Sequence, residues 1–141
     1  ARFGEVDVGR LLTDPGIIRS RAKIDAAIAG ARIYCDMADR GEDFAAYCWS
    51  FTDGAVVRGD GLTLPVKTPL SETVSKDLKR RGFKFVGSTI CYAFMQSVGM
   101  VNDHELSCFR YGEVGGTSSP RLPPGRNSTS PMTERAISLP D

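Results

Sequence analysis

The chain has 141 residues, of which 41% are hydrophobic and 25% charged, enough apolar material for the core of one domain. Its 18 Lys and Arg residues against 17 Asp and Glu residues leave a net charge of +1, so total charge indicates no class of partner. The mean hydropathy of -0.18 and the lack of a long apolar run argue against a transmembrane helix, and no secretory leader is recognisable. We therefore expect a cytoplasmic protein with reduced thiols, or with one thiol as a metal ligand, among its cysteines: Cys35, Cys48, Cys91 and Cys108.

Helical patterns occupy the first fifty residues. A short helix is predicted over Glu5–Thr13, because a turn-forming Asp-Pro-Gly sequence at residues 14–16 interrupts it. A long helix follows and is predicted to end near Arg40, where Gly41 offers a C-cap. Its apolar residues form one stripe at helical spacing: Ile17, Ile24, Ile28, Ala31 and Cys35. The same spacing predicts another short helix in the segment that contains Phe44, Tyr47, Cys48 and Phe51.

The middle of the chain is interrupted by glycine and proline. Residues 52–74 show no sustained period and are predicted to form a long connection, and the apolar run that ends at Val57 is too short to predict a strand. Ser75 is predicted to cap a short helix from Lys76 to Arg81, which Gly82 ends.

A hairpin over residues 83–87 is predicted to lead into the most apolar helix of the chain. Ser88 or Thr89 is expected to cap this helix, and Gly99 is expected to end it. The apolar residues that run through it are Ile90, Ala93, Phe94 and Val98.

Asn102 or Asp103 is predicted to begin a last short helix that carries His104 and Cys108. Residues four apart share one face of a helix, so the imidazole and the thiolate could bind one zinc ion, although structural zinc needs four ligands. From these residues alone, a partly buried histidine beside a small apolar cysteine is the favoured interpretation. A catalytic Cys–His pair is disfavoured, because no third group is evident to orient the histidine.

The predicted fold class is all-α, since no alternating pair of strands appears. The helical domain is expected to cover residues 1–111. Residues 112–141 are rich in proline, glycine and serine and are expected to form a disordered tail. Three arginines of this tail could contact an anionic partner, but a solvated tail is the favoured interpretation.

The hairpin is the first candidate binding site. Basic residues precede it: Lys76, Lys79, Arg80 and Arg81. The amides of Gly87, Ser88 and Thr89 would lie at the N-terminus of a buried helix, where free N–H groups and the helix dipole favour phosphate. Such an element grips a DNA backbone without reading bases. A turn between two helices with a solvated basic face remains the alternative.

These residues resemble a known family. The sequence RGFKFVGST of residues 81–89, followed by MQ at 95–96 and VNDH at 101–104, resembles DNA-3-methyladenine glycosylase I, of the helix-hairpin-helix DNA glycosylase superfamily. The segments GIIR at 16–19 and YCWSF at 47–51 match in the same order. The resemblance covers the chain from Ala1 to about Tyr111.

The resemblance implies an all-α, zinc-containing monomer that hydrolyses the N-glycosidic bond of 3-methyladenine in alkylated double-stranded DNA, with no membrane partner. Such an enzyme flips the damaged nucleotide into a pocket. It also implies that His104 and Cys108 are two of four zinc ligands. The DNA backbone would be held by residues of the hairpin: Gly82, Lys84, Val86, Gly87, Ser88 and Thr89.

The chain departs from the family pattern at its N-terminus. The base-recognition carboxylate, the stacking aromatic residues and the first two zinc ligands belong to a segment with no counterpart here, so the catalytic residues are unknown. The chain is accordingly expected to be the C-terminal part of a family member, or a degraded or mis-started version of one. Asn102 occupies the position at which many superfamily members carry a catalytic aspartate. Asp103 could act as the catalytic acid, but an N-cap of the last helix is the favoured role.

The sequence is compatible with three functions. The first is a base-excision glycosylase, and the second is a non-catalytic helix-hairpin-helix fragment that binds DNA and excises nothing. The third is no stable function, because a half-complete zinc site and an opened core need not fold alone. Release of free methylated base separates the first two functions, and loss of cooperative melting would favour the third.

Overall fold

The structure, a computed structural model, describes residues 1–114, in which helices predominate and the predicted all-α class is confirmed. The predicted tail, residues 112–141, begins too early, because Phe109–Glu113 form a helix; from residue 115 onward it lies outside the described residues. None of the described helices is long and apolar enough to cross a membrane. The elements in chain order are α1 Glu5–Thr13, α2 Arg21–Asp39, α3 Phe44–Ser50, β1 Val57–Arg58, α4 Pro69–Arg80, α5 Ser88–Ser97, β2 Val101–Asn102 and α6 Phe109–Glu113.

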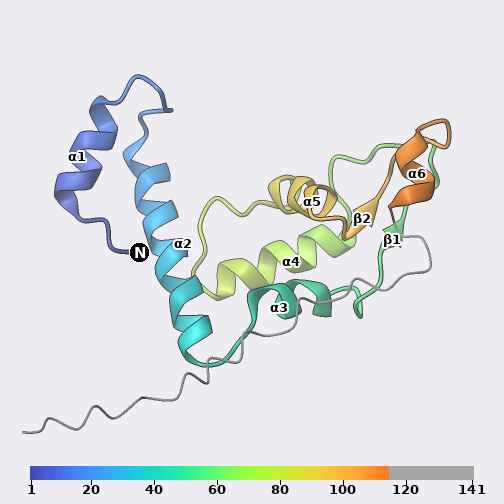
Figure 1. Ribbon diagram of the computed structural model, residues 1–141, viewed down its shortest axis with the longest axis horizontal. Coiled ribbons are helices and arrows are strands. Elements are labelled where there is room, and N and C mark those ends of the chain that lie inside the picture. The colour runs from blue at the N-terminus through green and yellow to red at the C-terminus, as the bar shows by residue number, and fades with distance from the viewer. Residues whose placement is uncertain (115–141) are drawn as a thin grey trace, which may run out of the picture.

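The helices form two unequal parts (Figure 1). α1 packs on α2, and the two extend as an arm from the body formed by α3, α4 and α5. Gly30 of α2 marks the junction, because a Cβ added there would lie 3.4 Å from the ring of Phe83, which follows α4. α2 therefore lies beside the segment between α4 and α5, at a distance where a Cβ would make an ordinary van der Waals contact.

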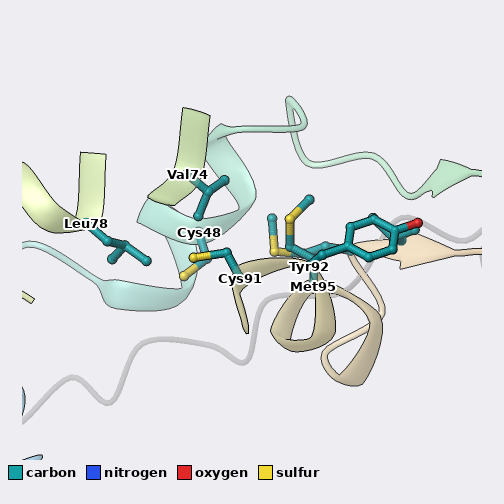
Figure 2. Close-up of a cluster of buried hydrophobic side chains, with 8 residues drawn as sticks. Cys48, Val74, Leu78, Cys91, Tyr92 and Met95 are labelled. Atoms are coloured by element: carbon teal, nitrogen blue, oxygen red, sulfur yellow. The ribbon is translucent and has the colours of Figure 1, made fainter. Parts of the chain in front are cut away.

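The core lies between α3, α4 and α5 (Figure 2). Met95 of α5 has no exposed surface, and Met100, just after α5, is 1% exposed. The other members of the buried cluster are Cys48, Val74, Leu78, Cys91, Tyr92 and Val101. All four cysteines are free thiols, and burial raises the pKa of Cys48 to about 11. The buried cysteines therefore act as small apolar side chains, since the thiolate is disfavoured there.

The start of α4 corrects the sequence prediction. The helix begins at Pro69, not after a Ser75 cap, so the long connection is shorter than predicted. Thr68 accepts a hydrogen bond from the amide of Ser71, and the Ser71 hydroxyl oxygen accepts one from the amide of Thr68. This reciprocal cap, with proline at the first helical position, was readable from the sequence Thr-Pro-Leu-Ser and was missed.

A second correction concerns strands. Val57 and Arg58 pair in parallel with Val101 and Asn102, although no strand was predicted. Each strand has only two residues, so alternation of apolar and polar side chains could not reveal them. The pairing joins the connection after α3 to the segment after α5, where the candidate metal residues lie.

The buried face of α2 differs from the predicted stripe, and α5 buries only some of its apolar residues. Ile17 precedes α2 and is 40% exposed, and Cys35 is exposed, because α1 and the body each cover only part of this helix. In α5 the buried residues are Cys91, Tyr92 and Met95, while Ile90 is 60% exposed. An apolar helix offers several candidate faces, and its neighbours decide which one is buried.

Met95 tests this assignment of the core. We expect Met95→Ala to destabilise the domain by about 3 kcal/mol, because it leaves a cavity in a site with no exposed surface. Ile90→Ala, in the same helix, should change stability by less than about 0.5 kcal/mol. Urea unfolding of both variants measures this difference, and equal losses would contradict the assignment.

Candidate nucleic-acid interface and metal site

A tight reversal joins α4 to α5. Gly82 adopts φ +98°, a conformation that favours glycine, and its amide donates to the carbonyl of Lys79. Phe85 also lies in the left-handed region, at φ +57°, with an exposed ring. Phe83 turns toward the core and packs against the buried cluster. The predicted hairpin is therefore present: Phe83 and Val86 pack against the core, and Lys84 and Phe85 between them are exposed.

The N-terminus of α5 differs from the prediction. Its N-cap is Gly87, not Ser88 or Thr89, and no side chain caps it. Gly87 adopts φ -64° and ψ 158°, and its carbonyl accepts the amide of Cys91 at 2.8 Å. Within the described chain, the amides of residues 87–90 have no protein acceptor, so they are available to an external anion. A Cβ added at Gly87 would meet nothing within 4 Å, so the site is open.

The basic residues near the hairpin fall into two groups. Arg80 and Arg81 of the predicted basic set form ion pairs with Asp77, and Arg81 also pairs with Glu42 at 2.7 Å. The Arg80 pair lies within α4, whereas the Arg81–Glu42 pair connects the end of α4 to the segment before α3. Lys84 is exposed on the hairpin and forms no salt bridge among the described residues, so its charge is directed to solvent.

The group around Asp77 ties α3 to α4. The hydroxyl of Tyr47 donates to Asp77 at 2.7 Å, and the guanidinium of Arg81 lies 4.2 Å from the centre of the Tyr47 ring. Burial and the hydrogen bond to Asp77 raise the pKa of Tyr47. The same hydrogen bond, together with the arginines, lowers the pKa of Asp77. The carboxylate is thus held in its charged form at the end of the helix that enters the hairpin.

The structure brings His104 and Cys108 together, but not on the predicted helix. α6 begins at Phe109 with Cys108 as its N-cap, and His104 lies in the preceding turn. Nδ1 of His104 is 3.7 Å from Sγ of Cys108. Two ligands of a tetrahedral zinc ion, one nitrogen and one sulfur, lie about 3.5 Å apart, so this pair fits half of a zinc site. The described residues hold no group of three or more possible metal ligands.

The two residues before His104 have structural partners. Asn102 is fully buried, and its amide donates to the carbonyls of Tyr111 at 2.9 Å and Val114 at 2.6 Å. Asp103 accepts hydrogen bonds from Tyr92 at 2.7 Å and Gln96 at 2.8 Å. The predicted N-cap role of Asp103 is therefore wrong, because its carboxylate faces α5 and no helix begins there.

An open hollow adjoins these residues, with a volume of about 660 Å³. α5 lines it with Ala93 and Gln96, and residues 61–64 line another side. Asp103, His104 and Cys108 also lie along its wall. Sequence reasoning selected the last two but did not predict that residues 61–64 approach them, because that contact joins segments some forty residues apart.

Comparison with solved structures defines the class of protein. A crystal structure of 3-methyladenine DNA glycosylase I matches with a TM-score of 0.73 and 50% identity, over 77% of this chain and 61% of that one. A variant of 3-methyladenine DNA glycosylase I in complex with 3-methyladenine matches with a TM-score of 0.69 and 26% identity, over 76% of this chain and 59% of that one. The fold is that of the helical DNA glycosylases.

Sequence comparison defines the family. The family model "Methyladenine glycosylase" matches residues 1–111, the range over which the resemblance was predicted. DNA-3-methyladenine glycosylase 1 of Escherichia coli (strain K12) is 49% identical over 114 residues, which cover 79% of this chain and 61% of that protein. The chain belongs to the methyladenine glycosylase family. It spans about three-fifths of the length of these relatives.

Proposed function

We propose that this protein is a base-excision repair glycosylase that hydrolyses the N-glycosidic bond of 3-methyladenine in alkylated double-stranded DNA. Membership of the family supports the activity, together with the structure of a relative in complex with 3-methyladenine. The observation that carries the proposal is the set of amides at the start of α5, which lack an acceptor among the described residues and adjoin the exposed Lys84. This arrangement suits a DNA phosphate.

In the proposed mechanism, hairpin residues 82–89 hold the DNA backbone while the damaged nucleotide leaves the base stack. Unstacking costs a few kcal/mol, which phosphate contacts must offset. The contacts would come from Gly82, Lys84, Val86, Gly87, Ser88 and Thr89. The adenine methylated at N3 carries a positive charge while it is attached to the sugar. It is therefore a good leaving group, and little acid–base assistance is required. This agrees with the side chain of Asn102, whose amide is already bonded to two carbonyls.

The activity is tested by incubating the protein with alkylated duplex DNA and separating free bases by chromatography. We expect release of 3-methyladenine, because the fold and family are those of enzymes that cleave this bond. Undamaged duplex serves as the control substrate and should release nothing. Binding of DNA without release of base would contradict this function.

Gly87 tests the contact with the backbone. We expect Gly87→Asp to weaken binding to duplex DNA by about tenfold at low salt, because a carboxylate would repel phosphate and compete for the amides of α5. The melting temperature should not fall, since aspartate is a favoured N-cap and the site has room for its Cβ. Gly87→Ala is the matched control and should bind within about threefold of the parent chain. Unchanged affinity of Gly87→Asp in fluorescence anisotropy would remove the hairpin from the interface.

We further propose that His104 and Cys108 bind a structural zinc ion with two ligands from elsewhere. Support comes from the separation of Nδ1 and Sγ, which matches adjacent ligands of a tetrahedral ion. The bound ion would supply a crosslink at the start of α6, next to the hollow. No step of the proposed reaction passes through it.

Removing either ligand tests the zinc proposal. We expect His104→Ala and Cys108→Ala each to at least halve the bound zinc and to lower the melting temperature by about 4 °C, because the metal stabilises the folded state. Cys35→Ala removes an exposed free thiol and is the matched control. Zinc is measured by mass spectrometry of the purified protein. Normal zinc content in both ligand variants would overturn the assignment.

A second candidate function is a DNA-binding module without catalysis. The observation in its favour is that the free amides of α5 and the exposed Lys84 suit the DNA backbone, a contact that requires no cleavage of a base. In this case the hairpin would bind duplex DNA and the base-release assay would be negative.

A further inference from the structure

A buried serine of α4 contacts the hairpin. Ser75 lies inside the helix and is only 3% exposed. A helical serine commonly donates to the carbonyl four residues earlier in its own helix. Here the hydroxyl instead donates to the carbonyl of Val86 at 2.6 Å, eleven residues later and beyond the turn. The bond therefore joins α4 directly to the residue that precedes the N-cap of α5.

The carbonyl of Val86 accepts from both helices. Sγ of Cys91, in the first turns of α5, lies 3.5 Å from the same oxygen. Cys91 is 3% exposed, so the carbonyl points into the interface between α4 and α5. Two donors from two helices thus fix the orientation of one peptide group in the hairpin.

The orientation of this peptide determines where the next amide points. The peptide is planar and trans, so the Val86 carbonyl and the Gly87 N–H point in opposite directions. With the carbonyl held inward by Ser75, the N–H is directed outward. It then lies beside the free amides of Ser88 and Thr89, which point toward the N-terminal end of α5.

The hairpin needs such a restraint. Phe85 occupies the left-handed region at φ +57° with its side chain 56% exposed, a conformation that L-residues adopt at a cost. Because the ring of Phe85 is exposed, its packing does not hold the turn. The turn is held by Phe83, which packs against the core, and by the buried hydrogen bond from Ser75.

We infer that Ser75 is a positioning residue of the phosphate-binding hairpin: its hydroxyl holds the Val86 carbonyl inward and so aims the Gly87 amide at a DNA phosphate. This role rests on the proposed function of the hairpin as the DNA-backbone contact. Ser75 touches no DNA itself. Its effect on DNA binding passes through the Val86–Gly87 peptide.

The test compares two buried serines of one helix. Ser75→Ala in the 141-residue chain should weaken binding to an undamaged duplex by about tenfold and lower the salt dependence by about one phosphate contact. Ser71→Ala is the matched control, because Ser71 is also fully buried but bonds only within the cap of α4. It should lower the melting temperature without changing DNA affinity or its salt dependence.

A more conservative variant distinguishes loss of the hydrogen bond from unfolding of the chain. Ser75→Cys keeps a weak donor of similar size and should retain more affinity than Ser75→Ala. Parental affinity in both Ser75 variants, while Gly87→Asp binds weakly, would overturn the positioning role and leave the hairpin contact intact. Affinity losses in Ser71→Ala that match those in Ser75→Ala would also overturn it. Parental affinity in Gly87→Asp would overturn the hairpin contact, and the positioning role with it.

Discussion

The structure depends on the reversal between α4 and α5. Seven residues, 81–87, must turn the chain so that α5 packs along α4 and buries Met95 in the same cluster as Leu78 and Val74. Such a short connection leaves few backbone conformations, and the left-handed geometry of Gly82 and Phe85 follows from it. The geometry that closes the core therefore also forms the projecting hairpin.

The core and the candidate DNA contact share this one turn. The inward side of the turn supplies Phe83 to the buried cluster and the Val86 carbonyl to Ser75. Its outward side carries Lys84 and the uncapped start of α5. A side-chain cap at α5 would stabilise the helix by about 1 kcal/mol, yet it would occupy the amides that an external phosphate needs. A side-chain cap that stabilises this end of α5 would therefore exclude an anion from the same amides.

Ion pairs and hydrogen bonds of acidic residues support both candidate sites. Arg81 pairs with Asp77 and with Glu42, just before α3, and Tyr47 of α3 donates to Asp77, so these contacts hold the end of α4 next to the turn. On the far side of α5, Asp103 is anchored by Tyr92 and Gln96, and it leads directly to His104. Both candidate sites are thus held by polar groups that lie against α4 or α5.

The sequence by itself determined the helical class, the bounds of α1, the turn at Gly82 and the family, since these depend on local spacing or on a distinctive sequence of residues. It predicted the His104–Cys108 pair for a helical reason, whereas the structure joins them through a turn before α6. The start of α4 was readable from its cap and was missed. The pairing of β1 with β2, the buried face of α5 and the bond from Ser75 to Val86 were decided only by the tertiary structure. Each depends on contacts between different elements of the fold, and such contacts leave no periodic pattern or local motif in the sequence.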